Sequence, residues 1–386
     1  MRILYTTSTT ELDGSSLSLL SLLDSVIAHG DTPFVVVPDA SGPLCEKLQQ
    51  KSIQYFKIPL TFFCYPSPRP YGKIWFFFDI KNILKTEYKA ERNLSKIISQ
   101  VKPDLIHTNV GPIVTGHFVA KKHKIPHIWH IREYGDLDFN LHFFPSKKIF
   151  HKLLNQDAVI SITHDLIQYN ELENNKKAFV IYNGVREKNN IHYLFPKSKF
   201  FLCASRVSPE KGHVETILTF SKFHQSHPEY KLIILGKGNK QFIDYLKDLS
   251  KEHSCSDAVV FQGFTANVAD YMKNATALLV GSYFEGFGRM TAEASFDGCI
   301  VIGKNSGGTR EIISQTGGFL YNTQEEMLAF MEDVANFTEE KYYSIAKKAQ
   351  QVAQNLFSIE NYTEKIYSIY TKILKLRNSI KYTKKL

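Results

Sequence analysis

The chain contains 386 residues, of which 43% are hydrophobic and 22% are charged. This balance excludes intrinsically disordered and collagen-like chains, and the length favours two domains. The net charge of +9 is compatible with nucleic acid, an anionic membrane or a phosphorylated ligand as partner, and it does not choose among them.

The five cysteines are odd in number and widely spaced, so the sequence predicts neither a disulfide framework nor a structural zinc site. The N-terminal segment Met1–Ser8 becomes polar too early for a signal peptide. No apolar run approaches the length of about 18 residues that a transmembrane helix needs. We therefore expect a cytoplasmic protein, with any membrane contact peripheral and at the inner face of the plasma membrane.

The first half of the chain alternates short β-rich runs with helical stretches, chiefly Ser15–His29 and Ile113–His123. The apolar runs are unbroken, which is typical of parallel strands covered by helices on both faces. Alternation of such strands with helices predicts a doubly wound α/β sheet. The expected strands are Ile3–Thr7, Phe34–Pro38, Ile53–Ile58, Leu105–Thr108, His127–Ile131, Ala158–Thr163 and Phe179–Tyr182.

The second half repeats this pattern after Arg186–Lys199, a polar stretch without periodicity that we interpret as a linker. The sequence thus predicts an α/β fold of two Rossmann-like, doubly wound domains facing across a cleft, residues 1–190 and 196–358. In open α/β sheets ligands bind at the carboxyl ends of the strands, so the cleft is the expected site. The expected strands are Phe200–Ala204, Leu232–Leu235, Val259–Phe261, Ala277–Val280, Ile300–Ile302 and Phe319–Tyr321, followed by helices over Gln324–Phe337, Glu339–Phe357 and Ile359 to about Leu376.

The strongest motif is Glu285–Glu293, which follows a predicted strand and opens a helix. Glu285 is expected on the loop and Glu293 in the first turns of the helix. Gly286 and Gly288 leave backbone N–H groups exposed at the helix N-terminus, where anions bind. Two carboxylates beside such N–H groups suit a ligand that combines hydroxyls with phosphate, such as a nucleotide sugar. The alternative is a glycine-rich turn with one exposed and one capping glutamate.

The second motif is Ser205–Gly212, directly after the strand Phe200–Ala204. Arg206 offers a two-pronged guanidinium and Lys211 a point charge, and together they are suited to hold a diphosphate. The alternative is a solvated basic loop in which Glu210 is the partner of these cations.

Two weaker signals lie in the first half. Gly14 links the first strand to the first helix, where a glycine lets the backbone approach a ligand, although Ser15 beside it also suits a helix cap. His130 stands near the end of the strand His127–Ile131, which is expected to face the cleft. With fourteen histidines in the chain, a structural role is the alternative for any one of them.

Together these motifs resemble the retaining, nucleotide-sugar-dependent glycosyltransferases of family 4, the glycosyl transferases group 1, which have the GT-B fold. The resemblance covers nearly the whole chain. The sequence lacks the prolines usual around the glutamate motif and has Asp13-Gly14 where many members have Gly-Gly. The resemblance is carried by Glu285–Glu293, the pair Arg206 and Lys211, the segment Asn305–Ile313, which is similar to a Gly-Gly-x-x-Glu segment, and Tyr182–Val185, which is similar to the usual end of the N-terminal domain.

The resemblance implies a role for each matched residue. Glu285 would contact hydroxyls of the donor sugar and Glu293 the ribose, and a C-terminal helix within residues 360–386 would pack back on the N-terminal domain. Gly14 would lie against the donor, His130 near the transferred sugar, and the basic pair on the diphosphate. The implied catalytic residues are Glu285, His130, Arg206 and Lys211, and the implied donor-binding residues are Gly14, Ser15, Arg206, Lys211, Glu285, Gly286, Phe287, Gly288, Arg289 and Glu293.

The expected chemistry is the retaining transfer of a sugar from a nucleoside diphosphate sugar to an acceptor hydroxyl. Cations and a helix N-terminus would stabilise the leaving diphosphate, so a metal is unnecessary, and no Asp-x-Asp pair lies near the motifs. We expect no metal and no cofactor besides the donor substrate. The expected acceptor is a glycan or a lipid-linked glycan in the assembly of bacterial cell-surface polysaccharide or glycoconjugate.

The positive charge is concentrated in two segments. Residues 47–102 hold 11 lysines and arginines against 3 acidic residues, and residues 360–386 hold 7 against 2. Within residues 62–98, aromatic residues precede a predicted basic amphipathic helix, Asp79–Ile98, which suits an anionic membrane surface. The alternative is an ordinary surface helix with its apolar side in the core. The basic stripe is Lys81, Lys85, Lys89, Arg92 and Lys96, and the aromatic residues are Phe62, Phe63, Tyr65, Tyr71, Trp75, Phe76, Phe77 and Phe78.

Two other functions stay open. A nucleotide-sugar epimerase on a similar fold would release a changed sugar nucleotide without an acceptor. A catalytically silent partner subunit would release no nucleoside diphosphate. Nucleic-acid binding is not expected, because the sequence shows no recognition helix, zinc finger or RNP-type motif.

Overall fold

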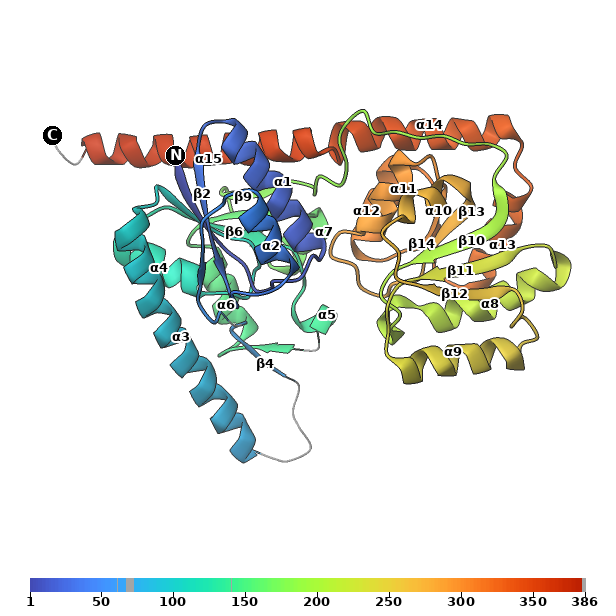
Figure 1. Ribbon diagram of the computed structural model, residues 1–386, viewed down its shortest axis with the longest axis horizontal. Helices are drawn as coiled ribbons and strands as arrows, with labels where there is room; N and C mark the ends of the chain where they lie inside the picture. The colour runs from blue at the N-terminus through green and yellow to red at the C-terminus, as the bar shows by residue number, and fades with distance from the viewer. Residues whose placement is uncertain (61, 67–72, 140, 384–386) are drawn as a thin grey trace. The chain divides into compact units, whose positions relative to one another are not determined.

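The computed structural model describes residues 1–60, 62–66, 73–139 and 141–383 (Figure 1). The chain divides into two compact units. Unit 1 comprises Met1–Tyr182 and Tyr362–Leu386, and unit 2 comprises Asn183–Asn361. The first unit therefore ends eight residues before the predicted limit at 190, and it is completed by the C-terminal segment.

Unit 1 is built on a seven-stranded sheet of order β3-β2-β1-β5-β6-β8-β9, in which all neighbours are parallel. The chain runs outward on one side of β1 (Arg2–Thr6) and then returns to the other side at β5 (Leu105–Thr108), so the strand order reverses between these two. The other strands are β2 (Thr32–Val37), β3 (Tyr55–Lys57), β6 (His127–Ile131), β8 (Ala158–Ser161) and β9 (Ala178–Val180).

Helices cover both faces of this sheet (Figure 1). One face carries α1 (Gly14–Ala28), α2 (Pro43–Gln50) and the C-terminal helix α15 (Ile359–Thr383), whose Tyr362, Ile366 and Tyr370 are buried in the same cluster as Ile3. The other face carries α3 (Lys73–Val101) and α4 (Thr115–His123). Burial on both faces explains why the strands are continuous apolar runs.

Unit 1 also contains a separate antiparallel pair, β4 (Cys64–Pro66) with β7 (Leu141–Phe143). Sequence analysis missed this pair, because three-residue strands are too short to show a period. Three short helices complete the unit: α5 (Asp136–Phe139), α6 (Lys147–Leu154) and α7 (His164–Tyr169).

Unit 2 has a six-stranded sheet of order β12-β11-β10-β13-β14-β15, again all parallel, with the reversal between β10 and β13. One face is covered by α8, α9, α13 and the start of α14, and the other by α10, α11 and α12. The strands are β10 (Ser198–Ala204), β11 (Lys231–Leu235), β12 (Val259–Gly263), β13 (Ala275–Val280), β14 (Val301–Lys304) and β15 (Phe319–Tyr321). The helices are α8 (His213–Ser226), α9 (Lys240–Glu252), α10 (Val268–Asn274), α11 (Arg289–Phe296), α12 (Gly307–Thr316), α13 (Gln324–Ala335) and α14 (Glu339–Leu356).

The segment Arg186–Lys199, interpreted from the sequence as a linker, belongs to unit 2. Arg186 forms a two-pronged ion pair with the buried Asp297, with both N···O distances 2.6 Å. The backbone N–H of His192 donates to the carbonyl of Phe296 at 2.8 Å, and β10 already begins at Ser198. The segment looked like a linker because its polar side chains run over the surface of unit 2, to which it is anchored.

Candidate active site

The Glu285–Glu293 motif lies at the carboxyl end of β13, next to β10, where the strand order of unit 2 reverses. Ligands of open α/β sheets bind at such reversal points. The helix α11 begins after Gly288, whose φ of +86° belongs to the left-handed region that favours glycine. The turn thus requires glycine at this position.

Glycines also let the loops at this edge press against one another. The N–H of Gly308 donates to the carbonyl of Glu285 at 2.7 Å, and a Cβ on Gly308 would lie 2.3 Å from the carbonyl oxygen of Phe287. A Cβ on Gly212 would lie 2.2 Å from the carbonyl oxygen of Gly281. The loops that follow β10, β13 and β14 are therefore fixed relative to one another by backbone contact.

The charged side chains of the two motifs are paired. Lys211 Nζ donates to Glu285 Oε2 at 2.7 Å, which joins the loop after β10 to the loop after β13. Arg289 Nε donates to Glu293 Oε1, also at 2.7 Å, within α11. Burial raises the pKa of Glu293, and the nearby Arg289 and Arg186 oppose this rise. An ammonium group has three N–H donors, so Lys211 keeps donors for a ligand while it is held by Glu285.

A cavity of about 180 Å³ lies among these loops. The loop after β10 contributes Arg206 and Lys211 to its lining, and the loop after β13 contributes Glu285, Gly288 and Arg289. The structure thus brings these five predicted site residues to one cavity.

The other predicted residues of the Glu285–Glu293 motif do not line the cavity. The ring of Phe287 is buried and packs edge-on against Phe357, with ring centroids 5.9 Å apart. Gly286 lies in the same turn, and Glu293 is turned toward Arg289. Arg206 is exposed and forms no ion pair with any residue that the structure describes, so its charge is available to a ligand.

In unit 1, the predicted residues Gly14 and Ser15 are the first residues of α1. Asp13 caps this helix by accepting from the N–H of Ser16 at 2.9 Å, so the helix cap, which was the alternative role for Ser15, is the aspartate. Asn109, which follows β5, donates from Nδ2 to the carbonyl of Ser15 at 3.4 Å. The loops after β1 and β5 therefore meet where the strand order of this sheet reverses.

His130 lies in β6 and is fully buried. Its Nδ1 is 3.1 Å from His107 Nε2 and 3.3 Å from Arg132 Nη2. The same Nη2 donates to Asn109 Oδ1 and to the hydroxyl of Tyr362 on α15, both at 3.0 Å. Burial, with the adjacent Arg132 charge, lowers the pKa of His130 well below its usual value. His130 is thus a neutral imidazole that Arg132 and Asn109 connect to Ser15.

Two residues of this edge were assigned no role from the sequence, Arg132 and Glu133. The N–H of Gly111 donates to Glu133 Oε1 at 3.1 Å. The Glu133 side chain is partly exposed. Desolvation by the surrounding protein, followed by the negative charge of Asp138, nevertheless raises the pKa of this carboxyl to about 8. Their signal in the sequence was the placement of charged residues directly after a buried strand, at the edge where ligands bind.

Residues 185–356, which make up most of unit 2, match the family of glycosyl transferases group 1. The second unit thus carries a group 1 glycosyltransferase domain. An uncharacterized 42.6 kDa protein from the cps region of Klebsiella pneumoniae is 23% identical to this protein over 93% of this chain and 96% of its own length. The alpha-monoglucosyldiacylglycerol synthase of Streptococcus pneumoniae is 23% identical over 73% of this chain and 69% of its own length.

The fold of this glycosyltransferase is also found in solved structures. The Anabaena protein HepE in complex with UDP and glucose has a TM-score of 0.75 at 19% identity, covering 96% of this chain and 99% of that one. A glycosyltransferase from Rickettsia africae has a TM-score of 0.77 at 18% identity, covering 97% and 98%. At these identities the likeness shows the fold, which is GT-B, as the sequence predicted.

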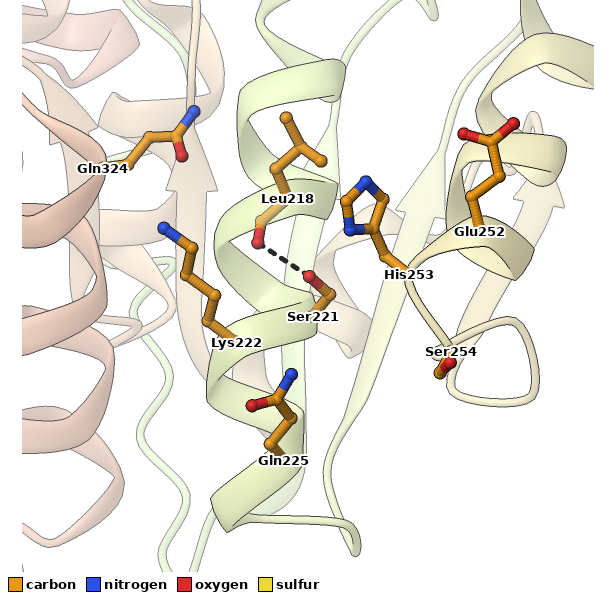
Figure 2. A pocket seen from close by; sticks show the side chains of 8 residues that line it. All are labelled: Leu218, Ser221, Lys222, Gln225, Glu252, His253, Ser254 and Gln324. Atoms are coloured by element: carbon orange, nitrogen blue, oxygen red, sulfur yellow. Dashed lines mark hydrogen bonds between the residues drawn. The ribbon is translucent and has the colours of Figure 1, made fainter.

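A second cavity of the glycosyltransferase, about 450 Å³, lies between α8, the end of α9 and the start of α13 (Figure 2). Ser221 Oγ donates to the carbonyl of Leu218 within α8 at 2.8 Å. Figure 2 shows that the polar ends of Lys222, Gln225 and Glu252 lie apart from one another, and all three residues are exposed. Because its polar groups do not converge, we assign no ligand to this depression.

Within the described residues, one group of three side chains has the chemistry of metal ligands: His117, His127 and Asp157. Both Nδ1 atoms approach the same Asp157 Oδ2, at 2.6 and 2.7 Å. These are hydrogen-bond distances, whereas ligand atoms around a tetrahedral zinc lie roughly 3.3 Å apart. The two histidines lower the pKa of Asp157 by donating to it, against its burial. We interpret the group as a structural tie between α4 and the amino ends of β6 and β8.

The helix α3 packs into the core toward its C-terminus and is exposed toward its N-terminus. From Ala90 onward its apolar residues, including Leu94, lie in the core, as expected for an ordinary surface helix. Toward its N-terminus Phe77 is 70%, Phe78 54% and Leu84 48% exposed, and this end projects beyond the sheet (Figure 1). Leu84 lies on the apolar side of the predicted amphipathic helix, as Leu94 does, but Leu84 is exposed whereas Leu94 is buried. The five residues of the predicted basic stripe are all exposed: Lys81, Lys85, Lys89, Arg92 and Lys96.

Part of the predicted membrane surface cannot be placed. Tyr71 lies outside the described residues, as do the side chains of Trp75 and Phe76. Among the residues that the structure does describe, no helix combines the length and the apolar character needed to span a bilayer.

Proposed function

We propose that this glycosyltransferase uses a nucleoside diphosphate sugar as its donor and binds it at the cavity of unit 2. The observation that carries this proposal is the convergence of Arg206, Lys211 and Glu285 on one cavity at the reversal point of the sheet. Cationic side chains stabilise a diphosphate, and a carboxylate accepts hydrogen bonds from sugar hydroxyls. The UDP and glucose bound by HepE, which has the same fold, support this assignment.

We assign the reaction to the retaining class of family 4. The acceptor hydroxyl attacks the anomeric carbon from the face that the diphosphate leaves. The bond from that carbon to the diphosphate oxygen breaks as the bond to the acceptor oxygen forms, and the hydroxyl proton passes to a donor phosphate oxygen. Arg206 and Lys211 stabilise the charge that develops on the leaving group, so the route requires no metal.

The roles that we propose within the donor site are those that the resemblance to the family implies. Glu285 accepts from hydroxyls of the transferred sugar, while Glu293 binds the ribose. The backbone at Gly14 and Ser15 approaches the donor, and His130 lies beside the transferred sugar. The Gly286–Arg289 turn, including Phe287 and Gly288, supplies and shapes the N-terminus of α11 near the phosphates.

We propose that unit 1 binds the acceptor, a glycan or a lipid-linked glycan of bacterial surface polysaccharide or glycoconjugate assembly. The carboxyl of Glu133, with its pKa of about 8, keeps its proton near neutral pH and can both donate to and accept from a hydroxyl. The exposed N-terminal half of α3 would hold the enzyme at an anionic membrane on the cytoplasmic side, through Phe77, Phe78 and the basic stripe. The monoglucosyldiacylglycerol synthase among the relatives supports a lipid-linked acceptor.

The test is a panel of UDP, GDP and ADP sugars, read first by thermal shift and then by release of nucleoside diphosphate. We expect one donor class to stabilise the protein and to release diphosphate faster when acceptor glycans are added. An altered sugar nucleotide without diphosphate release would identify an epimerase. Stabilisation without any turnover would identify a silent subunit, and no response to any donor would contradict the assignment of the cavity.

A further inference from the structure

A row of buried hydrogen bonds crosses unit 1 from α15 to β6. The hydroxyls of Tyr5 and Tyr370 are 3.0 Å apart, Tyr370 OH is 2.6 Å from His107 Nδ1, and His107 Nε2 is 3.1 Å from His130 Nδ1. All four side chains are fully buried. Hydroxyls and imidazoles both donate and accept, so this row alone is compatible with protons ordered in either direction.

Arg132 decides the direction. A guanidinium has only donors, and Arg132 Nη2 lies 3.3 Å from His130 Nδ1. A proton on Nδ1 would face the positive charge of this guanidinium and be repelled by it, whereas a lone pair there is attracted to that charge. His130 Nδ1 is therefore the unprotonated nitrogen, and His107 Nε2 donates to it.

The rest of the row agrees with this order. If His107 carries its proton on Nε2, its Nδ1 accepts from Tyr370, which in turn accepts from Tyr5. The opposite order would leave the hydroxyl proton of Tyr5 without an acceptor, since Tyr370 is its one hydrogen-bond partner in the described part of the chain, whereas this order places the one donor of the row without an acceptor at His130 Nε2. Burial, followed by the Arg132 charge, lowers the pKa of both imidazoles well below the usual value, so each carries a single proton.

We infer that Arg132 holds His130 as the Nε2–H tautomer, so that His130 presents a fixed hydrogen-bond donor to a substrate oxygen. Within the described residues, His130 Nε2 is buried and has no hydrogen-bond partner. A buried N–H without an acceptor is costly, and an oxygen of the bound sugar or phosphate would remove that cost. The substrate contact rests on the proposed function; the tautomer does not. His130 is then a donor and not a base, and Arg132 is its positioning residue.

The tautomer can be read directly by long-range ¹H–¹⁵N correlation on the full-length protein labelled at histidine, with His130→Gln used to assign the signals. The expected spectrum shows Nε2 protonated and Nδ1 unprotonated for both His107 and His130. A proton on His130 Nδ1, or on both nitrogens, would overturn the inference.

Variants at Arg132 test its role. In Arg132→Met the charged donor is lost, and we expect the ratio of tautomers at His130 to move at least about tenfold toward Nδ1–H. Arg132→Lys keeps a positive donor and should keep the wild-type tautomer. An unchanged tautomer in the methionine variant would refute the role of Arg132. If that variant does not fold, the wild-type spectrum still decides the tautomer.

The substrate contact is tested with the sugar nucleotide that stabilises the protein in the donor panel. Its addition should move the His130 Nε2–H proton signal downfield, as a new hydrogen bond forms. A donor that binds and turns over without moving this signal would refute the contact while leaving the proposed function intact. Absence of any donor binding would refute the proposed function while leaving the apo-protein tautomer unaffected.

Discussion

The two units share one topology but place their charged groups differently. In each, a parallel sheet reverses its strand order beside the loops that carry the candidate site. Unit 2 sets Arg206, Lys211 and Glu285 on loops around a cavity, where they are exposed or partly exposed. Unit 1 buries Arg132 and His130 in a network that reaches α15. The same sheet edge therefore serves one unit as an electrostatic site and the other as a rigid framework of directed hydrogen bonds.

This contrast predicts different responses to mutation. Removing an exposed charge of unit 2 should impair the reaction and leave the fold intact, because water replaces the lost partner. Removing a buried polar group should reduce stability, because the group left behind has no solvent. Three experiments test this division, and a fourth tests the exposed end of α3.

The largest effect is expected for the double variant Arg206→Ala, Lys211→Ala. Losing both cations should lower kcat/KM for sugar transfer by at least about a thousandfold, since one preorganised stabilising group is commonly worth 10²–10³ in rate. The melting temperature should change little. Lys240→Ala, which removes an exposed lysine of α9, is the matched control. Near-full transfer by the double variant would contradict the assignment of these cations to the leaving group.

Asp297→Asn tests the buried ion pair that anchors the segment after unit 1. The Asp297 side chain is fully buried and that of Arg186 is 12% exposed, so the substitution leaves an arginine charge without its partner. We expect the free energy of unfolding of unit 2 to fall by about 3 kcal/mol, measured by denaturant titration. Asp244→Asn, in an exposed pair with Lys240, should be nearly neutral. An equal loss of unfolding free energy in Asp297→Asn and Asp244→Asn would contradict the expected difference between buried and exposed charges.

Glu87→Gln tests a buried carboxyl of unit 1. Burial raises the pKa of Glu87 from 4.5 to about 7, although Thr115 Oγ1 donates to it at 2.9 Å. Between these pH values the unfolded chain releases this proton while the folded chain keeps it. The stability that Glu87 contributes is therefore present below pH 4.5 and is lost as the pH rises through 7.

The glutamine variant should consequently exceed the wild type in unfolding free energy by about 2 kcal/mol at pH 8, with the difference disappearing near pH 4. Denaturant titrations across this pH range measure it. Glu11→Gln, which changes an exposed carboxyl of the same unit, should show no such dependence. A pH-independent difference for Glu87→Gln would show that the carboxyl is not desolvated.

The smallest effect concerns the exposed end of α3. Phe77→Ser with Phe78→Ser should weaken binding to vesicles containing anionic lipid about tenfold at low salt, because two aromatic rings no longer enter the interface. Flotation assays measure the bound fraction. Tyr245→Ser, at a residue 50% exposed on α9, is the control. Absence of wild-type binding, or equal loss in the control, would exclude this surface as the membrane contact.

Much of the architecture could be predicted from the sequence, because buried parallel strands leave unbroken apolar runs. The bounds of Leu105–Thr108, His127–Ile131 and Phe319–Tyr321 were predicted to the residue. The short strands Cys64–Pro66 and Leu141–Phe143 were not predicted, since their pairing is a tertiary event that leaves no local period. The anchored segment after Tyr182 was interpreted as a linker because its polar surface conceals the pairing of Arg186 with Asp297.

Prediction of the candidate site from the sequence meets the same limit, because contacts between distant residues leave no local pattern. The motifs of unit 2 could be located because glycines and charges lie close together in the sequence. The pairing of Lys211 with Glu285 joins residues 74 positions apart, and no local pattern specifies it. In unit 1 the prediction singled out His130 and passed over Arg132, although Arg132 is two residues away. Its importance comes from contacts with Asn109 and Tyr362, which are distant in the sequence.

The return of α15 to the first unit has a consequence for biosynthesis. Tyr362, Ile366 and Tyr370 fill the same core as Ile3, yet roughly 180 residues separate them from Tyr182. At translation rates of about 5–20 residues per second, the ribosome needs roughly 10–40 s to supply that segment. During this interval the core of the nascent first unit lacks the side chains that α15 contributes. Unit 2, whose residues are continuous, can fold first, so the order of folding is expected to be the reverse of the order of synthesis.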